Sequence, residues 1–306
     1  MTGEFSAIAA IRAFLPDAPD ANQVWIGDDA AVLPRPAGTS MLLAADTVVA
    51  GVHADLMLTG LDDLGWKALM AAVSDVAAMG GDPGFCLITV AGPPETALDR
   101  LYDGLGAAAS ACQCPIVGGD LTNASDLVVT VAVTGSCDGD PVRRSGARPG
   151  DVIWVSRPLG GSAAGLRRYR ALAAGEARQV GDADLLRAHA RPTAELAAGR
   201  AARLAGARAM IDVSDGLAAD LGHIAEASGI GIEIDRVPVT PGATRDEALG
   251  GGEDFALAFC APEGAPVTRA FSGLPDPIRI GTCTGTADLL TVEGRPLDRT
   301  GWQHSW

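Results

Sequence analysis

The sequence has little positive charge and almost no lysine. Its 306 residues contain 23 Lys and Arg against 38 Asp and Glu, which gives a formal net charge of −15. Lys67 is the single lysine. Nucleic acids and anionic membranes are bound by basic surface patches, so the charge balance argues against both as partners. If a protein of this composition binds phosphates, the positive charge that binds them has to come from a source other than a basic surface patch.

Long apolar runs, a charged leader and paired cysteines are also lacking. No stretch approaches the length of a membrane span, and Met1 to Leu15 has no basic region followed by an apolar core, so we expect a cytoplasmic protein. The six cysteines contain no C-x-x-C pair and no metal-finger spacing. In a chain of this size we expect them to be buried small hydrophobic residues and not a disulfide framework.

Length and a linker-like segment predict two domains. The chain is longer than a typical single domain, and its composition of 48% hydrophobic but only 4% aromatic residues indicates cores packed from small side chains. The segment Cys137 to Pro141 has the composition of a linker. We therefore place the boundary near residue 139, between an N-terminal domain of residues 1–139 and a C-terminal domain of residues 140–306.

Strand-like and helix-like patterns alternate along both halves. Apolar or alternating runs predict the following strands: Met41–Val49, Phe85–Val90, Pro115–Val117, Leu127–Thr134, Val152–Ser156, Ala209–Ile211, Gly231–Ile234 and Phe255–Cys260. Helical periodicity predicts the following helices: Glu4–Leu15, Leu61–Met79, Glu95–Ala111, Asp184–Ala190, Thr193–Leu204 and Leu217–Ala227.

The stretch Ile211 to Leu217 places two carboxylates and a hydroxyl where a strand is expected to turn into a helix. Free N–H groups and the positive end of the helix dipole make such a junction a common anion site. Two aspartates would repel an anion there unless a cation lay between them and the ligand. A purely structural interpretation is also open, because Ser214 suits an N-cap, Asp215 the first helical turn and Gly229 the end of the helix.

The helix expected over Leu61–Met79 carries an acidic residue beside its apolar stripe. At about 100° per residue, Asp75 falls at the edge of that stripe, whereas Asp63 and Lys67 point away from it. A solvated aspartate would more naturally lie on the opposite side. The position of Asp75 therefore favours a buried pair or a functional group.

Several further carboxylates occur beside glycine, at strand ends or inside a strand. With those above, the set is Asp28, Asp29, Asp46, Asp75, Asp120, Asp212, Asp215 and Glu253. Turn chemistry accounts for any one Gly-Asp pair alone, and two carboxylates could form an acid and base pair, as in glycoside hydrolysis. Six or more fit better with several Mg²⁺ ions that take carboxylate and phosphate oxygens together. A triphosphate could not approach these carboxylates without the Mg²⁺ ions, because two unit negative charges about 4 Å apart repel by roughly 4 kcal/mol at an effective dielectric of 20.

Positive charge is densest in the loop Arg143 to Asp151, which contains three arginines. Such a loop is either solvated or a phosphate clamp. The glycine-rich segment Gly160–Gly165 predicts the start of another helix. It has neither the lysine of a Walker loop nor the glycine spacing of a dinucleotide fingerprint.

Seven motifs, taken in order, resemble those of the thiamine-monophosphate kinase family. They begin at Gly27-Asp28-Asp29, Asp46-Thr47, Ser74-Asp75, Gly118-Gly119-Asp120, Arg144-Ser145-Gly146, Ile211-Asp212-Val213-Ser214-Asp215 and Gly252-Glu253-Asp254. The resemblance covers nearly the whole chain. It implies the two-domain α/β (α+β) fold shared with aminoimidazole ribonucleotide synthetase, in which an N-terminal sheet domain forms a homodimer and a C-terminal α/β domain closes over the nucleotide. It also implies that ATP and thiamine phosphate react to give ADP and thiamine diphosphate.

The same resemblance implies roles for individual residues. The implied ligands of several magnesium ions are Asp28, Asp46, Asp75, Asp120, Asp212 and Asp215. The residues implied to meet ATP are Gly119, Asp120, Arg144, Ser214 and Tyr102, and those implied to meet thiamine phosphate are His53, Glu253 and Trp302. Relatives often carry Ser or Thr where this chain has Ala44-Ala45, so a metal contact at Ala45 would use its backbone carbonyl.

The implied reaction needs no general base, because the acceptor phosphate is already largely ionised at neutral pH. Bringing two anions together in line requires positioning and charge neutralisation. We therefore expect direct in-line transfer of the γ-phosphoryl group, with Asp120, Arg144 and Asp212 as the catalytic residues. Two alternatives stay open: another ATP-dependent synthetase of the same superfamily, and a non-catalytic module that binds nucleotide or divalent ions.

Overall fold

The computed structural model describes residues 23, 28–34, 38–287 and 289–302. The helix expected over Glu4–Leu15 and the first glycine of the Gly27-Asp28-Asp29 motif lie outside the described residues. None of the described helices has both the length and the apolar character that crossing a membrane requires.

The N-terminal half forms a five-stranded mixed sheet in the order β1-β2-β5-β3-β4. Its strands are β1 (Ala31–Pro34), β2 (Thr39–Val49), β3 (Asp82–Gly92), β4 (Ile116–Asn123) and β5 (Val128–Asp138). Only β3 and β4 pair in parallel; the other pairs are antiparallel. Alternation along β3 and β5 buries every second side chain, such as Ile88 and Val131, on one face of the sheet.

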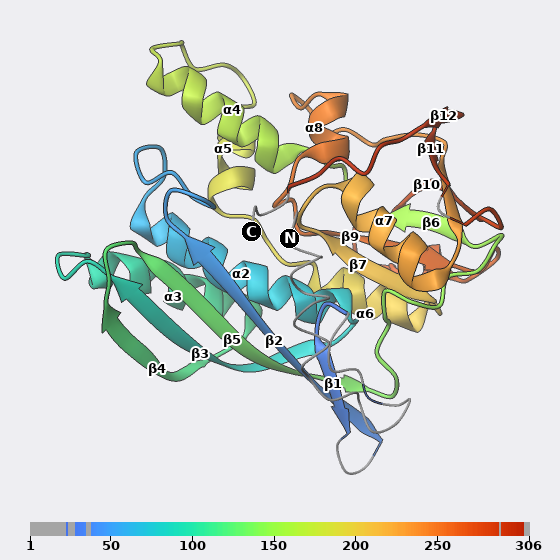
Figure 1. Cartoon of the computed structure of the whole chain (residues 1–306), viewed down its shortest axis with the longest axis horizontal. Coiled ribbons are helices and arrows are strands. Elements are labelled where there is room, and N and C mark those ends of the chain that lie inside the picture. The colour runs from blue at the N-terminus through green and yellow to red at the C-terminus, as the bar shows by residue number, and fades with distance from the viewer. Residues whose placement is uncertain (1–22, 24–27, 35–37, 288, 303–306) are drawn as a thin grey trace, which may run out of the picture.

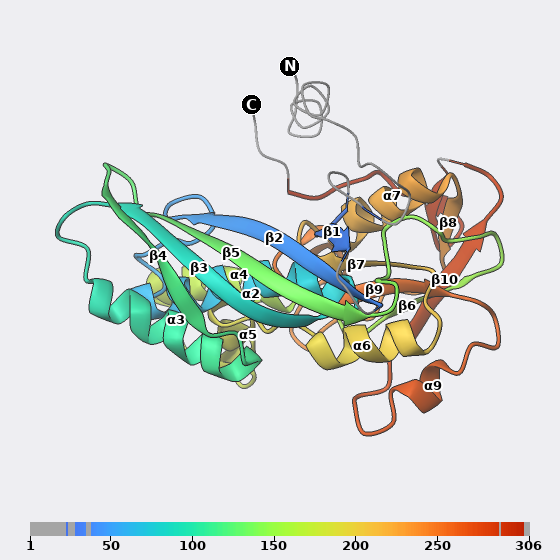
Figure 2. The same ribbon diagram turned by 90° about the horizontal axis from the view of Figure 1, so that it is seen from below.

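Helices α2 (Leu61–Ala78) and α3 (Leu98–Cys112) cover that face and complete the N-terminal core (Figure 1, Figure 2). No described helix covers the opposite face, which we call the open face. Phe85 and Leu87 of β3 are exposed on it, and Val117 and Leu121 of the edge strand β4 are exposed as well. Apolar side chains gathered at one sheet are a common sign of an interface.

The C-terminal half forms a seven-stranded sheet in the order β12-β11-β8-β10-β6-β9-β7. Its strands are β6 (Val152–Val155), β7 (Ala209–Val213), β8 (Gly231–Ile234), β9 (Ala256–Ala261), β10 (Ile278–Thr284), β11 (Leu290–Val292) and β12 (Arg295–Pro296). Its helices are α4 (Gly161–Ala173), α5 (Asp182–Ala190), α6 (Leu196–Leu204), α7 (Leu217–Ser228), α8 (Arg245–Gly250) and α9 (Val267–Ala270). β7 and β9 are buried at every position. The sequence of β9 is apolar throughout, as is typical of a strand buried on both faces, whereas β7 carries Asp212 in an otherwise apolar run.

Helix α2 is packed by both halves of the chain. Besides α3 and the N-terminal sheet it contacts α5, α6 and β7, and thirteen of its eighteen residues are buried. Its last turn joins a hydrophobic cluster that includes Met210 and Phe259 of the second sheet. Lys67, which we expected on the side away from the buried stripe, is only 2% exposed. That expectation is wrong because the C-terminal half covers the second side of the helix.

Most of the expected elements are present, and the differences are local. Gly119 and Asp120 lie inside β4 and not beyond its end, because pairing with β3 continues to Asn123. Cys137, which we expected in the linker, belongs to β5, and the domain boundary near residue 139 stays a proposal. Helix α8 was not expected. The six cysteines are free and buried, as expected.

Close packing of α2 on α3 yields a prediction about stability. A Cβ on Gly104 of α3 would lie 1.8 Å from the carbonyl oxygen of Asp62 in α2. We expect Gly104→Ala to lower the free energy of unfolding by about 1 to 3 kcal/mol through overpacking, although alanine is the better helix former by about 1 kcal/mol. Urea denaturation measures the change.

Gly106→Ala in the same helix is the matched control. A Cβ there meets no atom within 4 Å, so helix propensity alone should keep or raise stability. Equal effects of the two substitutions would contradict the close-contact argument.

Candidate functional site

A cavity of about 620 Å³ lies where the loop after β2 meets α2, α4, α5 and two segments of the C-terminal half. Six residues to which the sequence analysis gave a role line it: Asp46, His53, Ser214, Asp215, Glu253 and Trp302. They come from both halves of the chain. The fold therefore brings together polar groups that are far apart in the sequence.

A cluster of three carboxylates is the second feature of the site. Asp29, Asp75 and Asp212 each place one oxygen within 4.8 Å of the others, a spacing that could hold a metal ion. Asp29 precedes β1, Asp75 lies in the last turn of α2 and Asp212 near the end of β7. Asp29 and Asp212 are buried. We call these three residues the acidic cluster.

Burial and mutual repulsion shift the protonation of the acidic cluster. Burial, with the charge of Asp29 as the next cause, raises the pKa of Asp212 to about 8. Burial also raises the pKa of Asp75 well above its ordinary value, and the charges of Asp212 and Asp46 add to the shift. A bound divalent cation would favour the ionised forms. Closely spaced carboxylate oxygens are the ligands that Mg²⁺ prefers, so the residues fit this ion.

Asp46 connects the acidic cluster with the cavity. Alternation along β2 puts Asp46 on the same face as the buried Leu42 and Val48, toward α2. It lines the cavity and its charge acts on Asp75 and Asp212. Ala45 is exposed on the open face, and a metal contact through its carbonyl stays a prediction.

Arg144 holds the Asp28-Asp29 pair. Its guanidinium donates to both oxygens of Asp29, from Nε at 3.1 Å and from a terminal nitrogen at 2.8 Å, and its backbone N–H donates to the carboxylate of Asp28. Burial, followed by the charge of Asp29, raises the pKa of Asp28 to about 7. The sequence analysis took Asp28 as the metal ligand. The structure places Asp29 in the acidic cluster and ties Asp28 to the main chain of Arg144.

Ser74 is a site residue that the sequence analysis missed. It is fully buried in α2, and its hydroxyl donates to Oδ2 of Asp212 at 2.6 Å. This bond joins α2 to β7 and acts against the rise in the pKa of Asp212. A hydroxyl directly before Asp75, at the edge of a buried stripe, was the available signal.

At the junction between β7 and α7, a carboxylate of the chain itself binds two of the N–H groups. Gly216, and not Ser214, occupies the N-cap position. The carboxylate of Asp220 accepts hydrogen bonds from the N–H groups of Asp215 and Gly216, at 3.3 and 3.0 Å. An internal carboxylate thus satisfies these two N–H groups. Gly229 ends the helix in the left-handed conformation, as expected.

Backbone N–H groups at the glycine-rich start of α4 are also bonded by a carboxylate of the chain. Asp254 accepts hydrogen bonds from the backbone N–H groups of Gly160 and Ser162, and its own carbonyl accepts one from Arg157. This helix N-terminus is therefore closed to a phosphate. The neighbouring residue Glu253 faces the cavity.

His53 and Trp302 complete the cavity wall. The N–H of Val49 donates to Nδ1 of His53 at 3.0 Å, so Nδ1 lacks a proton and Nε2 carries the hydrogen of the neutral ring. The ring can therefore donate a hydrogen bond to an anion. Trp302 is half exposed, and its backbone N–H donates to the carbonyl of Asp215 at 3.0 Å.

Some residues with an implied role do not line the cavity in a single chain: Asp28, Asp75, Tyr102, Gly119, Asp120, Arg144 and Asp212. Asp28, Asp75, Arg144 and Asp212 lie in or beside the acidic cluster. Asp120 is in register, across β3 and β5, with Thr47 of β2, which is three strand spacings or about 14 Å away. Their roles stay predictions.

The sequence matches two family models and is similar to several known proteins. The family model "AIR synthase related protein, N-terminal domain" matches residues 27–137, and "AIR synthase related protein, C-terminal domain" matches residues 148–289. The thiamine-monophosphate kinase of Escherichia coli (strain K12) is 36% identical over 99% of this chain and 98% of its own length. That of Bacillus subtilis (strain 168) is 37% identical over 76% of each.

Solved structures agree with these matches. The structure described as "AaThiL complexed with AMPPCP and TMP" superposes with a TM-score of 0.87 at 32% identity. The match covers 99% of this chain and 97% of that chain. At this identity and coverage the similarity extends over both sheets.

The different contacts of Asp28 and Asp29 lead to a prediction about metal binding. We expect Asp29→Asn to weaken the binding of Mn²⁺, a substitute for Mg²⁺, by about tenfold or more, because it removes a charged ligand from the acidic cluster. Asp28→Asn keeps an oxygen acceptor for the N–H of Arg144 and should weaken binding far less. Calorimetric titration with Mn²⁺ measures both affinities. Equal losses would argue against the choice of Asp29.

Proposed function

The chain belongs to the thiamine-monophosphate kinase family of AIR synthase related proteins, and we propose that it phosphorylates thiamine phosphate to thiamine diphosphate with ATP. The observation that carries this proposal is the acidic cluster beside a cavity, with Asp46 in the cavity wall and its charge acting on Asp75 of the cluster. A kinase whose acceptor is itself a phosphate needs both features, because two polyanions must meet where their charge is neutralised.

The cavity suits the acceptor. A volume of about 620 Å³ is in the range of small-molecule sites. The carboxylate of Glu253 matches the cationic thiazolium ring and the exocyclic amine of thiamine phosphate, and Nε2–H of His53 can donate to its phosphate. Trp302 offers an indole face for stacking on a ring. The relative whose structure is described as complexed with AMPPCP and TMP supports two ligands in this fold.

The acidic cluster suits the donor side. Mg²⁺, when bound there, would supply the positive charge that reduces the repulsion between ATP and acceptor. Asp29, Asp75 and Asp212 would hold this ion, with Asp46 and Asp215 on the side of the cavity. Ser214 lines the cavity between these groups and contacts ATP. Metal contacts of Asp28 and Asp120 remain part of the proposal.

Transfer of the γ-phosphoryl group is direct and in line. An oxygen of the acceptor phosphate forms a bond to the γ-phosphorus while the bond from that phosphorus to the β–γ bridging oxygen breaks and ADP leaves. No residue has to accept a proton, because the acceptor is ionised. Arg144 stabilises the transferring group. Its guanidinium is bound to Asp29 in this structure, and it supplies positive charge beside the acidic cluster.

We also propose a homodimer formed through the open face of the N-terminal sheet. Phe85 and Leu87 are exposed on that face, and burying them would stabilise a second copy against it. Gly119 and Asp120 lie apart from the acidic cluster in one chain, and their contact with ATP remains part of the proposal. We still expect the protein to be cytoplasmic. We expect neither nucleic acid nor a membrane as a partner.

Phosphate transfer to thiamine phosphate, with and without magnesium, tests the function. We expect ADP release matched by thiamine diphosphate formation, and only when Mg²⁺ is present. ADP release with an aminoimidazole ribonucleotide precursor or with selenide in its place would indicate another synthetase of the superfamily. Binding of ATP or Mg²⁺ without ADP release would indicate a non-catalytic module.

Substitution of Asp212 tests the acidic cluster in the same assay. Asp212→Asn removes one charge but keeps an oxygen for the hydroxyl of Ser74, so we expect the fold to persist while kcat falls on the order of a hundredfold or more. Circular dichroism and thermal melting check the fold. Turnover like that of the wild type at ordinary magnesium concentrations would count against the assignment.

Substitution of Leu87 tests the dimer. Leu87→Glu puts a charge on the open face, and we expect a monomer by light scattering and a loss of turnover, because burying an unpaired charge in an interface is costly. Leu204→Glu is the control, since Leu204 is an exposed leucine of α6 in the other half. It should leave mass and turnover unchanged. A dimer that survives Leu87→Glu would exclude this face.

A further inference from the structure

The single lysine of the chain lines the cavity, beside His53 and Glu253. Lys67 extends from α2, and its side chain is 3% exposed. Its ammonium donates to Oε2 of Glu253 at 2.6 Å and to the backbone carbonyl of His53 at 3.3 Å. These are two of the residues that the proposed function assigns to thiamine phosphate, and they come from opposite halves of the chain. Lys67 therefore ties both walls of the cavity to one helix.

The histidine beside this ion pair is neutral. Nδ1 of His189 lies 3.9 Å from the same oxygen of Glu253 and 3.2 Å from the hydroxyl of Ser162. Burial, with the positive charges of Lys67 and Arg170, lowers the pKa of His189 to about 3. Among the described residues, Lys67 is thus the cation paired with Glu253.

The same geometry excludes a nucleophilic triad. Ser162 and Glu253 both approach Nδ1 of His189, whereas a proton relay needs one group on each ring nitrogen. The cluster around Glu253 is therefore suited to holding a carboxylate in place and not to forming a covalent intermediate.

The main chain of Glu253 is already fixed. Its φ of 62° is left-handed, and its N–H donates to the carbonyl of Ser214 at 2.7 Å. The next residue, Asp254, is bonded to the start of α4. What remains free in Glu253 is the rotation of its side chain. The hydrogen bond from Lys67 restricts this rotation, because it fixes the position of one of the two carboxylate oxygens.

We propose that Lys67 is a positioning residue for the acceptor: it holds one oxygen of Glu253 so that the other faces thiamine phosphate. The inference rests on the proposed function and adds a residue to which no motif gave a role. Both residues line the cavity, but the Glu253 side chain is 26% exposed and that of Lys67 is 3% exposed, so Glu253 presents the larger surface to the acceptor and Lys67 acts through it. The ammonium also offsets the charge of Glu253, which would otherwise repel the acceptor phosphate.

Lys67→Met is the main test, because methionine keeps an unbranched apolar side chain and removes the charge. We expect KM for thiamine phosphate to rise about tenfold or more, the effect of losing one oriented charge-assisted hydrogen bond. KM for ATP should change less than about twofold, and kcat should stay within a few-fold. Calorimetric titration of thiamine phosphate without ATP should show the same loss of affinity independently of turnover.

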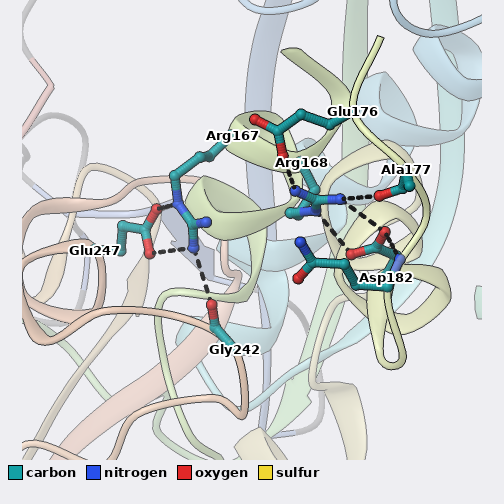
Figure 3. A network of polar contacts seen from close by, with 8 residues as sticks. Arg167, Arg168, Glu176, Ala177, Asp182, Gly242 and Glu247 are labelled. Carbon is teal, nitrogen blue, oxygen red and sulfur yellow. Dashed lines mark hydrogen bonds and ion pairs between the residues drawn. The ribbon is translucent and has the colours of Figure 1, made fainter. Parts of the chain in front are cut away.

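Arg167→Met is the matched control (Figure 3). Arg167 likewise pairs with a glutamate, Glu247, at 2.7 Å and donates to a backbone carbonyl, that of Gly242. It joins α4 to α8 outside the cavity. Loss of this ion pair should leave both KM values unchanged.

A double substitution tests whether Lys67 acts through Glu253. Lys67→Met combined with Glu253→Gln should raise KM for thiamine phosphate no further than Glu253→Gln alone. Losses that multiply would overturn the positioning role. If Lys67→Met does not fold, Lys67→Arg keeps the charge but moves the donor, and an unchanged KM in that variant would also overturn it.

The outcomes separate this inference from the function on which it rests. A wild-type protein that does not phosphorylate thiamine phosphate defeats the proposed function. An active wild type combined with a Lys67→Met variant of unchanged KM defeats only the role of Lys67. Equal rises in both KM values together with a lower Tm would reduce Lys67 to a structural ion pair and overturn the inference.

Discussion

Three carboxylates from distant parts of the chain lie within 4.8 Å of one another, and the site depends on holding them there. Like charges repel strongly where water is excluded. Arg144 offsets the charge of Asp29, Ser74 donates to Asp212, and a raised pKa allows Asp212 to take up a proton. A divalent cation that replaces the proton finds its ligands already assembled by folding, so little ordering opposes its binding.

Helix α2 is the element that makes this assembly possible. It carries Asp75 and Ser74 at one end and Lys67 near its middle, and it packs against elements of both sheets. A Cβ on Gly199 of α6 would lie 2.1 Å from the carbonyl of Ala77, which shows how closely the C-terminal half approaches. The acidic cluster and the cavity wall are therefore attached to one rigid helix.

Local patterns in the sequence were sufficient to predict most helices and strands, because strand alternation and helical periodicity depend on neighbouring residues. They also placed Asp46 and Asp75 where the structure has them. They could not separate Asp29 from Asp28, because that choice depends on where the main chain of Arg144 passes, more than one hundred positions away. They could not predict that Lys67 is buried, because the C-terminal half decides it. Nor does the sequence of the junction between β7 and α7 reveal that the carboxylate of Asp220 accepts hydrogen bonds from two of its N–H groups.

Burial of the one lysine has a consequence for the outer surface. The chain has 23 Lys and Arg, and Lys67 is 2% exposed, so the cationic side chains in contact with solvent at neutral pH are guanidinium groups. These stay protonated far into the alkaline range. Acetylating enzymes and amine-directed labels would find no ε-amino group on the folded protein. Any such adduct would report that α2 had come away from the segment that carries Glu253.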